Sequence, residues 1–233
     1  MFLFCRKKKI DLHGFNDCHS HILPGVDDGV RKMSDSLAIL QAYEEEGIGE
    51  VVFTPHIMAD VPNTPEDLRK RFEAFKQEYH GPVKLHLAAE YMLDSAFPAL
   101  LESGNLLTHG DGRRILVETS YFQPPMDFDN LLFDIQTRGY EPILAHPERY
   151  VYMGDKDYHT LRDKGIVLQM NIGSLCGLYG EAAMKKAHKL LLAGFYDLAG
   201  SDIHSPRMIP HFLETRLDRK TAEAFEAIKG FSI

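Results

Sequence analysis

Nine histidine and carboxylate residues stand in short polar segments that each follow an apolar run of the chain. Imidazole nitrogens and carboxylate oxygens together suit Zn, Mn and Fe, and the chain has no Cys-x-x-C pair for a thiolate site. Because a carboxylate can bridge two ions, the set is too large for one cation and fits three. The nine predicted ligands are His19, His21, Asp28, His56, Glu90, Glu118, His146, Asp202 and His204.

Two of the polar segments carry ligands two residues apart, which places both side chains on one side of an extended segment. His19 and His21 form the first pair, and Asp202 and His204 form the second. Asp28 follows the first pair after a turn rich in proline and glycine, which can fold its carboxylate back to the same place. This spacing allows one cation to take both members of a pair.

The competing interpretation is that these residues belong to an ordinary core. A lone His56, His146 or Glu90 is more often a structural residue than a ligand, since a single motif is only a hypothesis. Burying all nine groups without cations, however, would cost several kcal/mol each. The set therefore predicts a metal site. The remaining histidines are interpreted mostly as surface residues, with His211 kept open as a site residue; they are His13, His80, His86, His109, His159, His188 and His211.

Apolar runs that read as strands alternate with helical patterns along the chain. The runs are short and continuously apolar, as expected of parallel strands buried on both faces. Seven are predicted, at 14–17, 51–54, 85–89, 115–117, 143–145, 167–170 and 198–199. Helices are predicted from Ser34 or Asp35 up to Gly47, from Thr64 to Tyr79, from Phe128 up to Gly139, over 157–164, from Ala183 up to Gly194 and over 221–229.

Repeated strand–helix units favour an α/β fold with a parallel sheet. Seven such units with chemistry after the strands predict a (β/α)7 barrel whose carboxyl edge is the active face. An open doubly wound sheet is the alternative, but it would need a glycine-rich phosphate loop, and no G-x-G-x-x-G is present. Residues 1–233 are interpreted as a single domain.

Composition argues against some classes of binding partner and indicates a location. The net charge of −8 argues against nucleic-acid binding, and no apolar run approaches the ~20 residues of an integral membrane segment. Three cysteines without a pairing pattern fit a reducing compartment, so a cytoplasmic location is predicted. Residues 1–13 are interpreted as a loose or docked N-terminal extension; the alternative is weak contact of its basic residues 6–9 with an anionic membrane surface.

At these motifs the chain resembles the PHP (polymerase and histidinol phosphatase) superfamily. More narrowly, it resembles the metal-dependent bacterial protein-tyrosine phosphatases of capsular and exopolysaccharide operons. The resemblance runs in order from Asp17 to Arg207. It is carried by Asp-x-His-x-His at 17–21, Pro-Gly-x-Asp-Asp-Gly at 24–29, Thr-Pro-His at 54–56, strand-end Glu90 and Glu118, Ala-His-Pro-Glu-Arg at 145–149, the segment 169–177 and Ser-Asp-x-His at 201–204.

This resemblance implies a distorted TIM-like barrel of the PHP type. It also implies three divalent ions bound by the nine residues above, with manganese as the first choice and Fe, Zn or Mg as alternatives. The implied reaction is hydrolysis of phosphotyrosine on a tyrosine autokinase that controls polysaccharide synthesis. Arg149 and Arg207 are the implied phosphate clamps. The segment between His204 and Arg207 is shorter than is common in the family, which leaves Arg207 or a neighbour such as His211 to complete the phosphate site.

Such an enzyme must provide a large rate acceleration, because uncatalysed phosphate-monoester hydrolysis is slow enough to require up to ~10²¹-fold acceleration. A multi-metal site lowers the pKa of a bound water and clamps the reacting oxygens, and Arg149 offers bidentate contacts to phosphate. A cysteine-dependent phosphatase is excluded, because its Cys-x5-Arg loop is absent. The residues six positions after Cys5, Cys18 and Cys176 are Asp11, Pro24 and Ala182.

Two other functions stay open on the sequence alone. One is a PHP-type phosphoesterase that acts on a small metabolite such as histidinol phosphate, or on a nucleic-acid end. The other is a non-catalytic, metal-stabilised adaptor. The complete ligand set and Arg149 argue against the adaptor. No long insertion that could form a lid is visible, which favours a protein substrate over a small metabolite. The partner kinase and the oligomeric state are not determined by the sequence.

Overall fold

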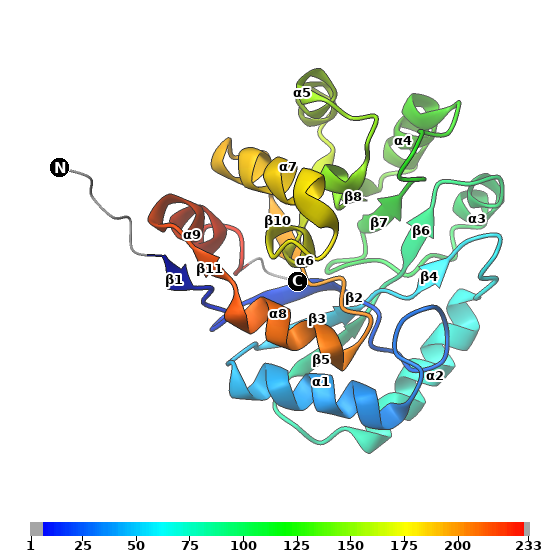
Figure 1. Cartoon of the computed structure of the whole chain (residues 1–233). Coiled ribbons are helices and arrows are strands. Elements are labelled where there is room, and N and C mark those ends of the chain that lie inside the picture. Colours follow the sequence, from blue (N-terminus) through cyan, green and yellow to red (C-terminus); the bar gives the residue numbers. More distant parts are fainter. Residues whose placement is uncertain (1–6, 231–233) are drawn as a thin grey trace.

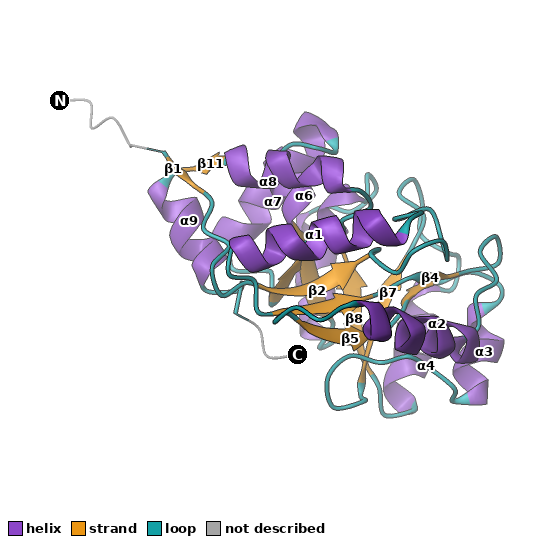
Figure 2. Ribbon diagram, turned by 90° about the horizontal axis from the view of Figure 1, so that it is seen from below, coloured by secondary structure: helices purple, strands orange, loops and turns teal. Residues whose placement is uncertain are grey.

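The computed structural model describes residues 7–230. Helices surround a central group of strands (Figures 1 and 2). The strands are β1 (Lys8–Lys9), β2 (Asn16–Ser20), β3 (Glu50–Phe53), β4 (His56–Ile57), β5 (Lys84–Leu87), β6 (Glu90–Met92), β7 (Arg114–Glu118), β8 (Glu141–Ala145), β9 (Val167–Asn171), β10 (Leu198–Gly200) and β11 (Arg216–Leu217). The α-helices are α1 (Met33–Glu45), α2 (Pro65–Glu78), α3 (Phe97–Ser103), α4 (Phe128–Thr137), α5 (Asp155–Asp163), α6 (Ile172–Leu175), α7 (Gly180–Leu192), α8 (Ile209–Glu214) and α9 (Arg219–Glu226), with 3₁₀ turns at Pro147–Arg149 and Pro206–Met208.

The main sheet is parallel and curled like half a barrel. It has six strands in the order β10-β9-β8-β7-β6-β4, and a second parallel sheet has the order β2-β3-β5. The two sheets meet where β2 lies beside the chain that leaves β10. There the amide of Asp202 donates to the carbonyl of His19 (2.8 Å), and the amide of His21 donates to the carbonyl of Ile203 (3.0 Å).

The expected α/β class with a curled parallel sheet is confirmed, but the main sheet has six strands and not seven. Two of the predicted strands are interrupted. The chain breaks at Thr54-Pro55 and again at Ala88-Ala89, then resumes as β4 and β6. Proline has no amide hydrogen for the ladder, so a strand that contains one tends to break there. As a result β3 pairs with β5 in one sheet, while β4 pairs with β6 in the other.

Most predicted helices are found, and their ends follow the expected signals. The Thr64 hydroxyl caps α2 by accepting a hydrogen bond from the Asp67 amide (3.2 Å). Gly139 and Gly194, just after α4 and α7, have φ of 86° and 70°, the left-handed conformation that glycine adopts most easily. Sequence analysis missed α3, α6 and α8, because segments of four to seven residues are too short to show a helical period.

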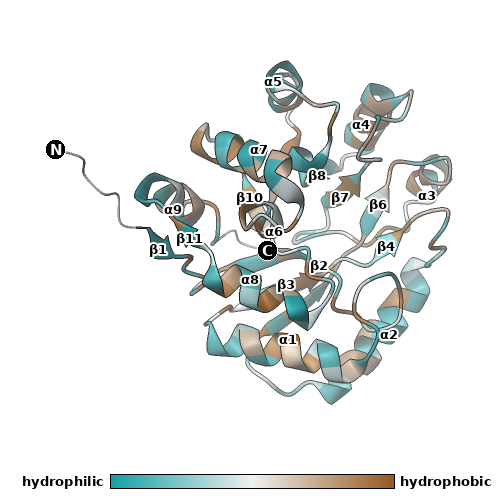
Figure 3. Ribbon diagram, viewed as in Figure 1, coloured by the Kyte–Doolittle hydropathy of each residue, from teal (hydrophilic) through white to brown (hydrophobic). Residues whose placement is uncertain are grey.

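The helices bury one face against the sheet. Apolar and hydrophilic residues alternate along α1 and α2 (Figure 3). On α2 the buried residues include Leu68, Phe72 and Phe75, spaced for one helical face, and the Phe75 ring lies 5.2 Å from that of Phe53 on β3. A smaller buried cluster joins side chains of four strands, namely Cys18, Leu116, Ile143, Ala145 and Leu198. This packing holds the strand ends in place.

Residues 7–13 of the predicted extension are docked on the domain. Strand β1 pairs antiparallel with β11, with Lys8 opposite Leu217. The ammonium group of Lys229 also lies 3.6 Å from an Asp11 carboxylate oxygen. Residues 1–6, which include Arg6 of the basic cluster, lie outside the described residues. Within the described part of the chain, no helix is long and apolar enough to cross a membrane.

Candidate metal centre

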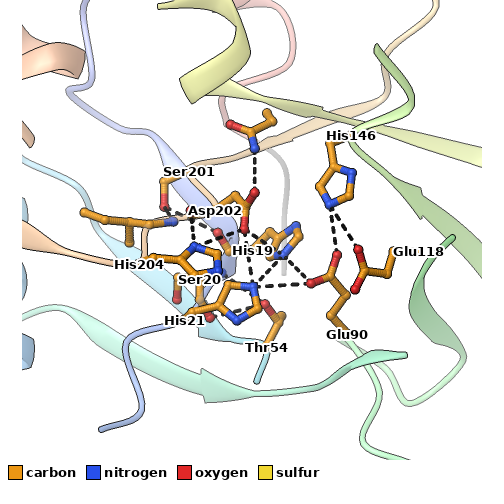
Figure 4. Close-up of polar contacts among 12 residues, drawn as sticks. His19, Ser20, His21, Thr54, Glu90, Glu118, His146, Ser201, Asp202 and His204 are labelled. Atoms are coloured by element: carbon orange, nitrogen blue, oxygen red, sulfur yellow. Dashed lines mark hydrogen bonds and ion pairs between the residues drawn. The ribbon is translucent and has the colours of Figure 1, made fainter. Parts of the chain in front are cut away.

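All nine predicted ligands come together at the carboxyl edge of the strands. β2 supplies His19 and is followed by His21, and β7 ends with Glu118. His56 and Glu90 follow β3 and β5, as the first residues of β4 and β6. His146 follows β8, the pair Asp202 and His204 follows β10, and Asp28 reaches the same place from the loop after β2. Figure 4 shows the imidazole rings and carboxylates pointing toward one another. The structure thus brings the nine predicted residues together, and their role as metal ligands stays a prediction.

The innermost group lies around two histidine nitrogens. The Nε2 atoms of His19 and His21 are 3.1 Å apart. Glu90 Oε2 lies 3.2 Å from the first and 3.3 Å from the second. Asp202 Oδ1 lies 3.5 Å and 3.3 Å from the same two atoms. Ligand atoms of a divalent ion bound at about 2.0–2.2 Å are spaced in this way around it.

The other ring nitrogens explain why this arrangement needs a cation. Nδ1 of His19 lies 3.0 Å from Gln169 Oε1, and Nδ1 of His21 lies 2.9 Å from Asp27 Oδ2. Both oxygens are acceptors, so each Nδ1 carries its hydrogen and a neutral ring presents the Nε2 lone pair to the site. Two lone pairs, or two protons, repel each other at 3.1 Å. A shared cation removes that repulsion.

A second group surrounds His56. Its Nδ1 lies 3.1 Å from Glu90 Oε2 and 3.1 Å from Glu118 Oε1. Within residues 7–230, His56 Nδ1 and Glu90 Oε2 are buried without a hydrogen bond of good geometry. Buried polar atoms are rarely left in this state without an ion or a water molecule. On the far side of Glu90, Oε1 lies 3.0 Å from Nε2 of His146.

A third group is open to solvent. Asp28 Oδ1 lies 3.5 Å from His56 Nε2 and 3.4 Å from His204 Nε2, and the Asp28 side chain is 71% exposed. His21, Asp28, His56 and His204 each offer one ligand atom within 4.8 Å of the others. The site therefore runs from a dry inner part to an outer part that a substrate can reach.

Two ligands sit on strained backbone. His146 and Asp202 have φ of 36° and 51°, and they are the non-glycine residues with positive φ in the described part of the chain. Such conformations cost about 1–3 kcal/mol each and cluster at functional sites. The strain turns both side chains toward the centre directly after their strands end.

The charges of the site reinforce one another. Burial opposes a positive charge on His19, but the carboxylates of Glu90 and Asp202 outweigh burial and raise the pKa of His19 to about 9. Burial likewise opposes ionisation of Asp202, but His19 and His21 hold the pKa of that carboxyl well below its usual range. The hydrogen bond from His204 lowers the pKa of Asp28 to about 2. The carboxylates stay ionised at neutral pH, which favours bound cations.

Strand β9 supplies no ligand, yet two of its side chains hold ligands in place. Gln169 positions His19, as described above, and the Asn171 amide donates to Asp202 Oδ2 at 2.7 Å. Both residues belong to the family motif at 169–177, which by itself indicates no role for them. Asp27 likewise had no predicted role, although it orients His21. The polar residues inside an otherwise apolar strand were the available signal.

Arg149 lies at the mouth of the centre between two aromatic rings. Its Cζ is 4.3 Å from the ring centroid of Tyr121 and 3.9 Å from that of Tyr179, which matches cation–π stacking. Its Nη1 donates to Asp202 Oδ2 at 2.8 Å. The cavity in front of it has a volume of about 470 Å³ and is lined by Asp28, His56, Glu90, Tyr121, His146, Arg149, Leu178, Tyr179, Asp202, His204 and Met208.

Two other predicted residues lie away from this cavity wall. Arg207 lines a neighbouring pocket that shares His204 with the first one. His211 is exposed on α8 and lines neither pocket. His109, one of the seven histidines interpreted mostly as surface residues, is an exception: it is buried, with Nε2 2.8 Å from the Cys18 carbonyl oxygen. The segment that carries His109 folds back against β2.

Clustered imidazoles and carboxylates at the carboxyl edge of a curled parallel sheet, with an arginine at the opening, define an α/β protein with a candidate metal centre. The chain belongs to the CpsB/CapC family of capsular polysaccharide synthesis, whose model matches residues 15–224. This confirms the resemblance to bacterial phosphatases of capsular operons, and the PHP superfamily is consistent with it.

Similar proteins carry matching names. The chain is 31% identical over 196 residues to the tyrosine-protein phosphatase YwqE of Bacillus subtilis (strain 168), covering 81% of this chain and 77% of that protein. It is 29% identical over 221 residues to the tyrosine-protein phosphatase CpsB of Streptococcus pneumoniae, covering 87% and 88%. A crystal structure from work on these two proteins, described as unique metal-dependent tyrosine phosphatases, matches with a TM-score of 0.73 and 25% identity over 92% of this chain and 96% of that one.

Proposed function

We propose that this protein is a metal-dependent protein-tyrosine phosphatase. The observation that carries the proposal is Arg149, a fixed guanidinium that faces the same cavity as the nine clustered ligand residues. The names of the similar proteins point to the same reaction. An arginine beside metal ligands suits a phosphate ester, because phosphate needs both charge neutralisation and directional hydrogen bonds.

The nine ligand residues would hold the ions, and we propose three of them, with Mn²⁺ first and Fe, Zn or Mg as alternatives. Carboxylate and imidazole ligands suit these metals, and the three groups of ligand atoms around His19, His56 and Asp28 support the number. When bound, divalent ions lower the pKa of water to supply a hydroxide and neutralise charge on the phosphate.

The protein's own residues do the rest. Arg149, stacked between Tyr121 and Tyr179, turns its free guanidinium edge to the phosphate and holds it in line for attack. We propose Arg207, at the rim, as a second arginine that contacts the phosphate. A tyrosyl ester leaves as a phenolate, which needs less help from a general acid than an alkoxide does.

For the fold, we propose that the two sheets together make one distorted, TIM-like (β/α)7 barrel of the PHP type, formed by a single domain over residues 1–233. The hydrogen bonds between β2 and residues 202–203 support closure on one side. On the other side β3 and β4, and likewise β5 and β6, follow each other directly and act as two interrupted strands. This count gives seven strand positions around one centre.

The substrate is proposed to be a phosphotyrosine on a protein, with a tyrosine kinase of polysaccharide export as the partner, in the cytoplasm. The third ligand group supports a protein substrate, because the exposed Asp28 leaves the centre accessible from outside. The family description, capsular polysaccharide synthesis, supports the pathway.

Hydrolysis of a phosphotyrosyl peptide tests the proposal. A chelator should abolish turnover and added Mn²⁺ should restore it, whereas alkylation of the cysteines should leave it largely intact. A phosphoserine peptide should be cleaved more slowly. Equal turnover on phosphoserine and histidinol phosphate would instead favour the small-metabolite phosphoesterase. Activity that resists chelation and is lost on alkylation would overturn the metal mechanism.

A further inference from the structure

A second pocket adjoins the metal centre. It has a volume of about 380 Å³ and lies between the loop that leads into α1 and the segment that follows β10. Gly29 to Lys32 form one side, and Ser205 to Arg207 form the other. His204 lines both this pocket and the catalytic cavity, so the two are neighbours across one side chain.

This pocket carries a concentration of unpaired positive charge. Its lining includes Arg31, Lys32 and Arg207, all exposed, against one carboxylate, Asp35. Within residues 7–230, none of these three cationic side chains has an acidic partner within 4.0 Å or a hydrogen bond. The chain as a whole has a net charge of −8, so a local positive excess runs against its overall balance.

Some exposed lysines elsewhere have an acidic partner and others, such as Lys156, have none among the described residues; this pocket differs in gathering three unpaired cationic side chains. Lys84 lies 2.8 Å from Glu50, and Lys189 lies 2.5 Å from Asp155. Three like charges gathered without partners repel one another and stabilise nothing in the fold. Such an arrangement is useful when an anion arrives from outside, because the positive pocket then both attracts it and pairs with it.

We propose that this basic pocket binds a second anionic group of the protein substrate, next to the phosphotyrosine in the catalytic cavity. The group is a carboxylate or another phosphate, and the inference rests on the proposed function. A peptide whose phosphate reaches Arg149 leaves the cavity past His204, and the next residues of the peptide then meet Arg31 and Lys32. The protein thereby selects phosphotyrosines that stand among acidic or phosphorylated residues.

The interaction is exposed, so it should be salt-sensitive and moderate in size. Pairs of exposed charges are screened over about 8–10 Å at physiological salt. We expect an acidic flank to lower KM about tenfold, because several weak pairs act together. The turnover number should not depend on Arg31 and Lys32, since neither residue lines the catalytic cavity.

The experiment compares three phosphotyrosyl peptides of equal length, with a neutral flank, an aspartate-rich flank or a second phosphotyrosine. p-Nitrophenyl phosphate serves as a substrate without a flank. The test protein is the double variant Arg31→Ala/Lys32→Ala. The matched control is Arg138→Ala/Lys156→Ala, which removes the same two residue types from exposed positions that line neither pocket. Metal content and Tm verify that both variants fold.

The pocket is supported if wild type and control show a lower KM for a charged peptide, and if Arg31→Ala/Lys32→Ala abolishes this advantage without changing hydrolysis of p-nitrophenyl phosphate. The charged peptide with the larger decrease in KM shows whether the pocket prefers a carboxylate or a second phosphate. Equal KM for neutral and charged peptides in wild type would overturn it. If wild type hydrolyses none of the substrates, the proposed function fails; fluorescence anisotropy with the labelled charged peptide still decides whether the pocket binds it.

Discussion

Two buried histidines of this protein have pKa values shifted in opposite directions. His19 lies in the metal centre with none of its surface exposed, and His109 lies before β7, at the other end of the strands, with 2% exposed. Burial disfavours the charge on both. At His19 the carboxylates of Glu90 and Asp202 outweigh burial and raise the pKa to about 9. At His109 burial dominates and lowers the pKa to about 4.

The difference between these two pKa shifts distinguishes a structural core histidine from one in a candidate cation site. His109 meets the carbonyl oxygen of Cys18, a neutral acceptor, and stays neutral itself. His19 meets two ionised carboxylates and a second imidazole, so the surroundings demand positive charge. Burial alone therefore does not mark a ligand; convergence of buried carboxylates on buried imidazoles does.

The largest loss of activity should come from removing the Glu90 carboxylate, which the surroundings of His19 have and those of His109 lack. Glu90→Gln leaves the shape but removes the carboxylate that lies within 3.3 Å of His19, His21 and His56. We expect metal content to fall and turnover to drop ~10³-fold or more. Elemental analysis should find more than one divalent ion per chain in wild type and fewer in the variant.

Glu223→Gln, on the exposed face of α9, is the control for Glu90→Gln and should retain both metal and activity. A wild-type stoichiometry that stays at or below one ion under metal-replete conditions would rule out a cluster. Full metal content in Glu90→Gln would show that Glu90 is not a ligand.

Arg149→Ala should be the next largest change. The variant should keep its metals, because Arg149 meets the Oδ2 atom of Asp202, while the Oδ1 atom faces the histidines. We expect turnover to fall about 10²–10³-fold, as for loss of one preorganised charge donor. Arg149→Lys should recover little, since an ammonium cannot stack between Tyr121 and Tyr179 in the same way. Joint loss of metal and activity would make Arg149 a structural residue.

A smaller effect should follow from loosening a ligand without removing it. Asn171→Ala removes the amide that donates to Asp202 Oδ2 at 2.7 Å. Loss of such a support typically costs about 10–100-fold in metal affinity or activity. A Mn²⁺ titration monitored by activity and by calorimetry measures the shift. Tyr179→Phe is the milder comparison, because it keeps the ring on Arg149 and loses the hydroxyl, which lies 3.4 Å from Asp202 Oδ2. Unchanged Mn²⁺ affinity in Asn171→Ala would contradict the role.

The smallest expected effect is on the pH dependence of folding stability, and it comes from His109. The pKa of His109 falls from 6.5 unfolded to about 4 folded, so the unfolded chain binds the extra proton first as the pH drops. The stability contribution is therefore complete above pH ~6.5 and is lost as the pH falls toward ~4. Relative to wild type, metal-loaded His109→Gln should gain about 2 kcal/mol between pH 7 and 5. Urea unfolding at both pH values measures the change, and an unchanged difference would contradict it.

The sequence by itself determined the α/β class, the family resemblance and the set of candidate ligands. All three follow from local patterns, namely polar residues directly after apolar runs and helix starts such as Thr64. Local patterns are readable because parallel strands bring their carboxyl ends to one edge whatever the details of the loops. Arg149 came from the family resemblance, through the Ala-His-Pro-Glu-Arg motif at 145–149.

Features that depend on contacts between residues far apart in the sequence became visible only in the tertiary structure. The pairing of β3 with β5 and of β4 with β6, which leaves six strands in the main sheet, joins segments more than 30 residues apart. The burial of His109, the support of Asp202 by Asn171 and the place of Arg207 beside Arg31 are of the same kind. Each of these depends on where a loop folds back in space, and residue spacing along the chain carries little information about that path.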